Sequence, residues 1–205
     1  MEFQLCSGTF TGMHIEPKPS GNACFEGLLP EWMRGVKPPS TGADDKTRMD
    51  YVLRLAELNV EHRTGGPFAA AVFRPDGSLA AAAVNVVVPA GCYLLHAEVL
   101  ALALAQRALG EPGTVGRQAA NCDLFSSAEP CAMCFGAIAL SGISRLVCGA
   151  TTPDVEAVGF DEGPKPDNWA DILAARGIET KRDVRRERAA VILAQYHDLG
   201  NPIYQ

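Results

Sequence analysis

Residues 129–134 read EPCAMC and residues 94–109 read LLHAEVLALALAQRAL, and these two stretches together decide the fold. The longer stretch is apolar nearly all round, which predicts a buried helix over 96–109. The shorter one has two cysteines three positions apart after a proline, where a helix over 131–141 is predicted to begin. Each helix follows a predicted buried strand, so both helix N-termini can point at one spot.

Strand and helix patterns alternate along the rest of the chain. The apolar spacing predicts an amphipathic helix over 45–62, with Asp44 or Asp45 as its N-cap. Pro-Asp-Gly at 75–77 predicts a hairpin between two strands. The expected strands are 68–74, 78–87, 122–127, 144–150 and 178–184, and the further expected helices are 151–160, 166–177 and 184–199. This alternation predicts an α/β sandwich with a mixed sheet.

The first 42 residues differ in composition from the rest. They are rich in glycine, proline and serine, which predicts an irregular N-terminal extension over 1–42. Residues 43–205 are predicted to form one domain. The whole chain of 205 residues is 47% hydrophobic, enough for a core of ordinary size.

Charge argues for a small substrate. The net charge of -6 does not attract phosphate backbones over a distance. The one basic stretch, KRDVRRER at 181–188, is interrupted by Asp183 and Glu187, which is typical of a solvated helix face. A small or uncharged substrate is therefore expected, and a nucleic acid is not.

The cysteines indicate a reducing compartment. There are 7, an odd number at irregular spacings, and residues 1–20 lack the pattern of a signal peptide. No apolar run is long enough to span a bilayer. We therefore expect a soluble cytoplasmic protein in which the 131/134 pair is a metal site, with a redox pair or two buried thiols as alternatives.

A zinc site explains why these residue types occur together. Cys131 and Cys134 share a helix face, and the positive end of a helix favours thiolates. With His96 they form a set of three ligands, which leaves the fourth tetrahedral position of a catalytic zinc for water. Glu98, two residues from His96, can serve as the proton acceptor. The pairing of H-A-E with P-C-x-x-C is typical of zinc deaminases.

The non-enzymatic alternative is a structural zinc module. Such a site needs a fourth protein ligand, for which Cys92, Cys122 or Cys148 is available. None of the three stands at a ligand-like spacing. Chelation separates the two hypotheses, because loss of a structural zinc unfolds the chain whereas loss of a catalytic one abolishes activity first.

The chain resembles the cytidine deaminase superfamily from about residue 48 to its C-terminus. The motifs most similar to bacterial guanine deaminases, some of which also accept ammeline, are GGPFAAAVF (65–73), VNVVV (84–88), HAEVLAL (96–102), SAEPCAMCFGAI (127–138) and DVEAVGFDEGP (154–164). The resemblance implies a three-layer α-β-α sandwich around a mixed five-stranded sheet. It also implies zinc-dependent hydrolytic deamination of a free base, with guanine converted to xanthine and ammonia.

The resemblance also implies roles for individual residues. One Zn²⁺ per subunit would be bound by His96, Cys131 and Cys134, and Glu98 would carry the proton of the attacking water to the ring and to the departing amine. Glu162 would be a second acid, with Asp161 in its place if the register differs. The residues implied in substrate binding are Asn85, Phe68, Ala97, Phe160 and Tyr204.

Relatives with this C-terminal tyrosine imply an assembly. In them the C-terminal segment is exchanged between the subunits of a homodimer, so Tyr204 would act in the partner's site. The other deaminases that share the superfamily remain alternatives for the substrate: those acting on cytosine or cytidine, on guanosine, or on tRNA adenosine.

Overall fold

The computed structural model describes residues 27–110 and 119–204. The helical elements are η1 (Glu31–Gly35), α2 (Asp45–Glu61), α3 (Val87–Ala90), α4 (Ala97–Leu109), α5 (Ala132–Ser141), α6 (Thr152–Ala157), α7 (Trp169–Ala175) and α8 (Arg186–Asp198). The strands are β1 (Ala69–Phe73), β2 (Leu79–Val84), β3 (Asp123–Ala128), β4 (Arg145–Ala150) and β5 (Glu179–Lys181). Every strand and helix expected from the sequence is present.

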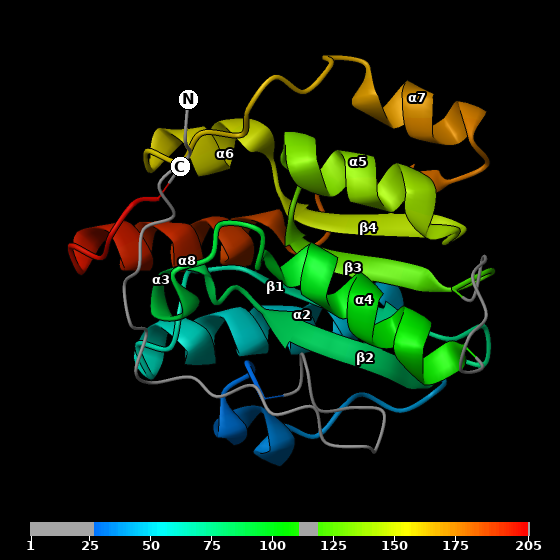
Figure 1. The fold of residues 1–205 in the computed structure, drawn as a ribbon, viewed down its shortest axis with the longest axis horizontal. Helices are drawn as coiled ribbons and strands as arrows, with labels where there is room; N and C mark the ends of the chain where they lie inside the picture. The colour runs from blue at the N-terminus through cyan, green and yellow to red at the C-terminus, as the bar shows by residue number, and fades with distance from the viewer. Residues whose placement is uncertain (1–26, 111–118, 205) are drawn as a thin grey trace, which may run out of the picture.

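The five strands form one mixed sheet in the order β2-β1-β3-β4-β5. Strand β1 runs antiparallel to both neighbours, whereas β3, β4 and β5 are parallel. Helices α4 and α5 lie on one face and α2 and α8 on the other (Figure 1). The predicted α/β sandwich of three layers is confirmed.

The arrangement places two helix N-termini at one end of the sheet. Parallel strands β3 and β4 are joined through α5, so α5 begins beyond the carboxyl end of β3. Helix α4 packs on β1 and β2 and lies beside α5 (Figure 1). Strand β1 is buried along its whole length and consists mainly of alanine, which leaves room for helices on both of its faces.

The structure corrects the predicted end of the second hairpin strand. Strand β2 ends at Val84, not at 87, and the apolar residues that follow form α3. The Asn85 side chain accepts a hydrogen bond from the Val87 backbone N–H at 3.1 Å, which turns the chain out of the sheet. At the predicted N-cap of the helix over 45–62, Asp44 accepts from the Thr47 N–H at 2.8 Å and begins α2 as expected.

The described part of the N-terminal extension contains a short 3-10 helix, η1, that the sequence did not predict. Trp32 of η1 packs against the hydrophobic core and donates through Nε1 to the Thr64 hydroxyl at 3.1 Å. Thr64 in turn donates to the buried Asn59 side chain at 2.8 Å. Residues 1–26, with Cys6 and Cys24, lie outside the described part of the chain, so the boundary at 42 remains a prediction.

The basic stretch 181–188 is neutralised within the fold. Each of its five cations lies within ion-pair distance of a carboxylate, in the pairs Lys181–Asp45, Arg182–Glu129, Arg185–Asp50, Arg186–Asp154 and Arg188–Glu57. This agrees with the expectation of a solvated face and does not favour a phosphate-binding surface. Across residues 27–110 and 119–204, no helix has both the length and the apolarity needed to cross a membrane.

Candidate active site

Two helix starts bring the three predicted metal ligands together. His96 is the N-cap residue of α4 and Cys131 is the N-cap residue of α5, while Cys134 lies in the first turn of α5. Their ligand atoms all lie within 4.8 Å of one another. His96 Nδ1 is 3.5 Å from the Cys131 sulfur and 3.6 Å from the Cys134 sulfur.

These distances fit a zinc ion. Tetrahedral zinc with bonds of about 2.3 Å to sulfur and about 2.05 Å to nitrogen holds the two atoms about 3.6 Å apart. The hydrogen bond from Cys134, with further help from His96, lowers the pKa of Cys131 to about 4, whereas the same hydrogen bond and burial raise the pKa of Cys134. The three residues present therefore suit Zn²⁺ as a donor set.

Among residues 27–110 and 119–204, no third cysteine joins this cluster as a fourth ligand. The metal-binding group found among the described residues consists of His96, Cys131 and Cys134 alone. Cys122 and Cys148 are buried in the hydrophobic core, and Cys92 is a partly exposed free thiol. A set of three protein ligands is the arrangement of a catalytic zinc site, which disfavours the structural zinc module.

Glu98 is buried beside this cluster at 7% exposure. Its Oε1 accepts a hydrogen bond from the Ser126 hydroxyl of β3 at 3.3 Å. Burial raises the pKa of Glu98, and a negative Cys131 raises it further. A carboxylate with raised proton affinity beside a metal site has the properties of a general base and acid.

A cavity opens over the cluster. It is lined by Phe68, Asn85, Tyr93, His96, Glu98, Ala128, Glu129, Cys131, Phe160, Asp161, Glu162 and Tyr204. The four predicted substrate-binding residues Asn85, Phe68, Phe160 and Tyr204 are among them. Ala97, the fifth, packs in the hydrophobic core at 0% exposure and is not part of this lining.

Three aromatic rings form one wall of the cavity. Phe160 contacts Phe68 and Tyr204 edge to face, with ring centroids 5.0 Å and 5.1 Å apart. The C-terminal segment is held there because Tyr196 of α8 donates to the Pro202 carbonyl at 2.7 Å. In the single chain, Tyr204 therefore covers the chain's own cavity. Exchange of this segment between subunits remains a prediction.

Asn85 lines the cavity beside the loop at 64–67. Because the Asn85 Oδ1 accepts from Val87, the amide presents its Nδ2 group as a donor to a ligand. Gly66 lies so close that a Cβ there would be 1.8 Å from the Tyr204 hydroxyl oxygen and 3.2 Å from Asn85 Oδ1. The Tyr204 hydroxyl is buried and hydrogen-bonds to none of the described residues, so it is also available to a ligand.

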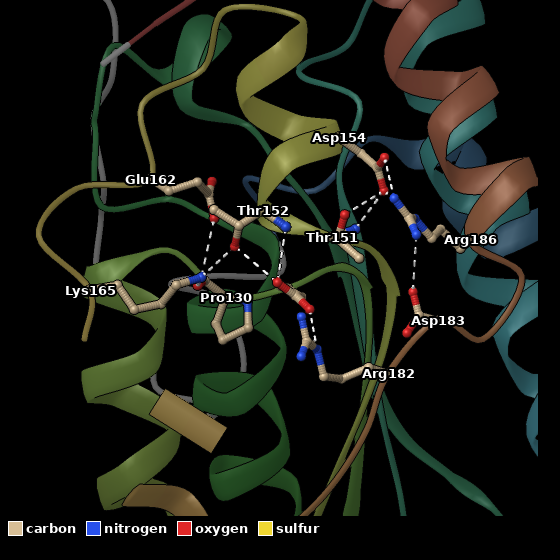
Figure 2. A network of polar contacts seen from close by, with 10 residues as sticks. Pro130, Thr151, Thr152, Asp154, Glu162, Lys165, Arg182, Asp183 and Arg186 are labelled. Atoms are coloured by element: carbon tan, nitrogen blue, oxygen red, sulfur yellow. Dashed lines mark hydrogen bonds and ion pairs between the residues drawn. The ribbon is translucent and has the colours of Figure 1, made fainter. Parts of the chain in front are cut away.

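Glu162 lies on the loop that follows α6, and this loop is hydrogen-bonded to the start of α5. Its backbone carbonyl accepts from the Ala132 N–H at 2.8 Å, and its carboxylate is 3.8 Å from the Lys165 ammonium nitrogen (Figure 2). Burial raises the pKa of Glu162 to about 8, against the opposing charge of Lys165. Asp161 is exposed and accepts from the Gly163 N–H at 2.7 Å, so its side chain stabilises the turn. This geometry supports Glu162 over Asp161 as the second acid.

Sequence reasoning missed four residues in or beside the cavity. Tyr93 and Ala128 line it, as does Glu129, whose carboxylate is buried and paired with Arg182. Lys165 is buried behind Glu162. Glu129 stands in the quoted EPCAMC motif, so its position was a usable signal. Lys165 lies in an irregular loop, and no periodicity predicts the burial of a loop lysine.

Comparisons with known proteins agree with this geometry. The family model "Cytidine and deoxycytidylate deaminase zinc-binding region" matches residues 43–150. Guanine deaminase of Bacillus subtilis is 33% identical over 117 residues, covering 57% of this chain and 71% of that protein.

Two solved structures are similar over most of the chain. One is described as guanine deaminase from Nitrosomonas europaea, with 44% identity and a TM-score of 0.72 over 83% of this chain and 94% of that one. Another is described as NE0047 in complex with 2,6-diaminopurine, with 45% identity and a TM-score of 0.74 over 86% of this chain and 94% of that one.

Proposed function

Since the chain belongs to the cytidine and deoxycytidylate deaminase family of zinc-binding proteins, we propose that it hydrolyses the exocyclic amine of a free purine base, converting guanine to xanthine and ammonia. The observation that carries this proposal is the cluster of His96, Cys131 and Cys134 beneath a cavity that Glu98 shares. Ammeline, a triazine with the same cyclic amidine, is a second proposed substrate.

We assign the metal to these three side chains, with one Zn²⁺ per subunit. The distances of 3.5 Å and 3.6 Å from His96 Nδ1 to the two sulfurs support the assignment. Zinc bound there supplies a Lewis acid that makes a water molecule nucleophilic near neutral pH. The chain's own part in the reaction is to hold the base and to move protons.

Glu98 is the proposed proton carrier. The Ser126 hydroxyl engages its Oε1, which leaves Oε2 to take the proton of the attacking water. Glu98 then gives that proton to the ring nitrogen next to the attacked carbon. Glu162, held neutral by burial near pH 7, is suited to supply a proton to the departing amine. As the C–N bond breaks and ammonia leaves, the added oxygen becomes a carbonyl and its remaining proton returns to Glu162.

The cavity walls suit a flat base with a carbonyl group. Phe68 and Phe160 offer apolar ring faces and edges to a planar heterocycle. The Nδ2 donor of Asn85 is matched by a carbonyl oxygen, which guanine has and adenine replaces with an amino group. Tyr204 covers the cavity and keeps bulk water from the base.

The setting of the enzyme is proposed as well. Residues 43–205 form the deaminase domain, and two copies form a homodimer that can exchange its C-terminal segments. The protein acts in the cytoplasm, where a reducing environment keeps Cys131 and Cys134 available as ligands.

The test is to incubate the purified protein with guanine, ammeline, cytosine, cytidine and guanosine and to measure ammonia, together with bound zinc. We expect release from guanine and about one zinc per chain. Chelation should abolish the activity before it unfolds the chain, and added zinc should restore it. Release from cytidine without release from guanine would overturn the choice of base, and a protein without zinc would overturn the mechanism.

A further inference from the structure

A buried lysine joins the two sides of the candidate active site. Lys165 follows Glu162 by three positions, and its side chain is only 6% exposed. We propose that Lys165 is a positioning residue of the deamination reaction, whose ammonium group holds the loop carrying Glu162 against the start of the metal-binding helix α5. The inference rests on the proposed function, because it assigns Lys165 to a step in which Glu162 takes part.

The ammonium group is fixed by several partners. It donates to the Pro130 carbonyl at 2.6 Å and to the Thr152 hydroxyl at 2.7 Å (Figure 2). The Trp169 ring lies under it, with its centroid 5.2 Å from the nitrogen. An ammonium has three donors, and these contacts use two of them.

The remaining interaction reaches Glu162. The distance of 3.8 Å from the Lys165 nitrogen to Glu162 Oε2 is too long for a hydrogen bond, so the attraction is between charges. Oε2 is buried and hydrogen-bonds to none of the residues that the structure describes. The positive charge of Lys165 thus stabilises Glu162 after it gives up a proton, without occupying the oxygen that must hold that proton.

Lys165 also ties this loop to the cysteine ligands. Pro130 directly precedes Cys131, so the bond from Lys165 to the Pro130 carbonyl acts at the residue before the first sulfur. The Ala132 N–H donates to the Glu162 carbonyl at 2.8 Å and forms a second link between loop and helix. Removal of Lys165 leaves only one of these two links.

The far side of the network is anchored by the buried carboxylate of Glu129. Both the backbone N–H and the hydroxyl of Thr152 donate to Glu129 Oε2, at 2.9 Å and 3.0 Å. Because the hydroxyl donates to Glu129, its lone pairs are free to accept from Lys165. Arg182 pairs with the other oxygen of Glu129. The lysine is therefore held in place before a substrate arrives.

A double-mutant cycle tests the proposal. The kcat and KM for guanine, the bound zinc and the melting temperature are measured for wild type, Lys165→Met, Glu162→Gln and the double variant. We expect Lys165→Met to lower kcat about tenfold with zinc retained, and to change kcat less than about twofold when Glu162 is already Gln. Lys181→Met, which removes a lysine from an exposed ion pair with Asp45, is the matched control and should keep the wild-type kcat.

Each contrary outcome is distinct. Equal losses in both backgrounds, or an unchanged kcat in Lys165→Met, would overturn the role of Lys165 while leaving guanine deamination intact. A fully active Glu162→Gln would remove the partner through which Lys165 acts. If Lys165→Met does not fold, Lys165→Gln replaces it, since an amide can still donate to Pro130 and Thr152 but lacks the charge. A wild-type protein that releases no ammonia from guanine would instead reject the proposed function.

Discussion

Gly66→Ala is the perturbation that most directly tests how the cavity is closed. A Cβ at this position would lie 1.8 Å from the Tyr204 hydroxyl oxygen and 2.8 Å from its Cζ. To restore an ordinary contact of about 3.4 Å, the hydroxyl must retreat by about 1.6 Å. The phenol ring is packed against Phe160, so this retreat lifts Tyr204 away from the aromatic wall.

Overpacking of this kind costs about 1–3 kcal/mol. If this energy destabilises the closed cavity in which Tyr204 covers the bound base, affinity for the base drops roughly 5- to 150-fold, since about 1.4 kcal/mol corresponds to a tenfold change. We therefore expect a raised KM for guanine and a smaller change in kcat, measured by steady-state ammonia release. Gly42→Ala is the matched control, because a Cβ there meets nothing within 4 Å.

The same substitution in a Tyr204→Ala background separates this explanation from a general disturbance of the loop. With the phenol removed, Gly66→Ala should add little to the loss already caused by Tyr204→Ala. Gly66→Ala with wild-type KM and kcat would refute the reasoning, since Tyr204 would then not lie against Gly66 when substrate binds.

Three further predictions concern other parts of the molecule. Glu98→Gln should lower kcat by about 10²–10⁴-fold while the protein still binds zinc, as measured by turnover and metal analysis. Asp45→Asn should cost about 2 kcal/mol in the free energy of unfolding at pH 7, because the hydrogen bond from Arg145 holds the pKa of Asp45 well below its usual range. That stability is present above the unfolded pKa of about 4, so the difference from wild type should shrink as the pH falls below it. Trp32→Phe should cost about 1 kcal/mol through the lost bond to Thr64, measured by urea unfolding.

Each of these predictions has an outcome that contradicts it. Turnover by Glu98→Gln within threefold of wild type would assign the proton transfer elsewhere. A difference between Asp45→Asn and wild type that is constant from pH 7 to pH 3 would mean that Arg145 does not stabilise the Asp45 carboxylate. Wild-type stability in Trp32→Phe would show that η1 packs without its hydrogen bond to the domain.

Local patterns in the chain were enough to predict most of the fold. The spacing of apolar residues located α2 and α8, because a buried stripe at helical period has few other solutions, and a stretch that is apolar nearly all round located α4. The boundary at Val84 was misplaced, since the apolar run continues past it. Asn85 ends the strand there by a side-chain bond to the backbone, which hydrophobicity does not encode.

The residues of the candidate site likewise fall into those that the sequence predicted and those that only the structure revealed. His96, Glu98, Cys131 and Cys134 were named from the sequence because ligands and base sit at fixed offsets within two helix starts. The contributions of Glu129 and Lys165 depend on residues more than ten positions away in the chain. Glu129 stands within the EPCAMC motif, but no local pattern marks Lys165 or predicts that either side chain is buried, because the burial of a charged side chain is a property of its neighbours in space.

The sequence alone determined which side chains can bind zinc and at which helix N-termini they lie. These side chains are only a few residues apart within each helix start, so local helix geometry sets their relative orientation. The folded chain decided which distant side chains close the cavity, namely Tyr204 over Gly66 and Lys165 behind Glu162. The physical reason is that these contacts depend on how the loops pack around the sheet, which local propensity does not encode.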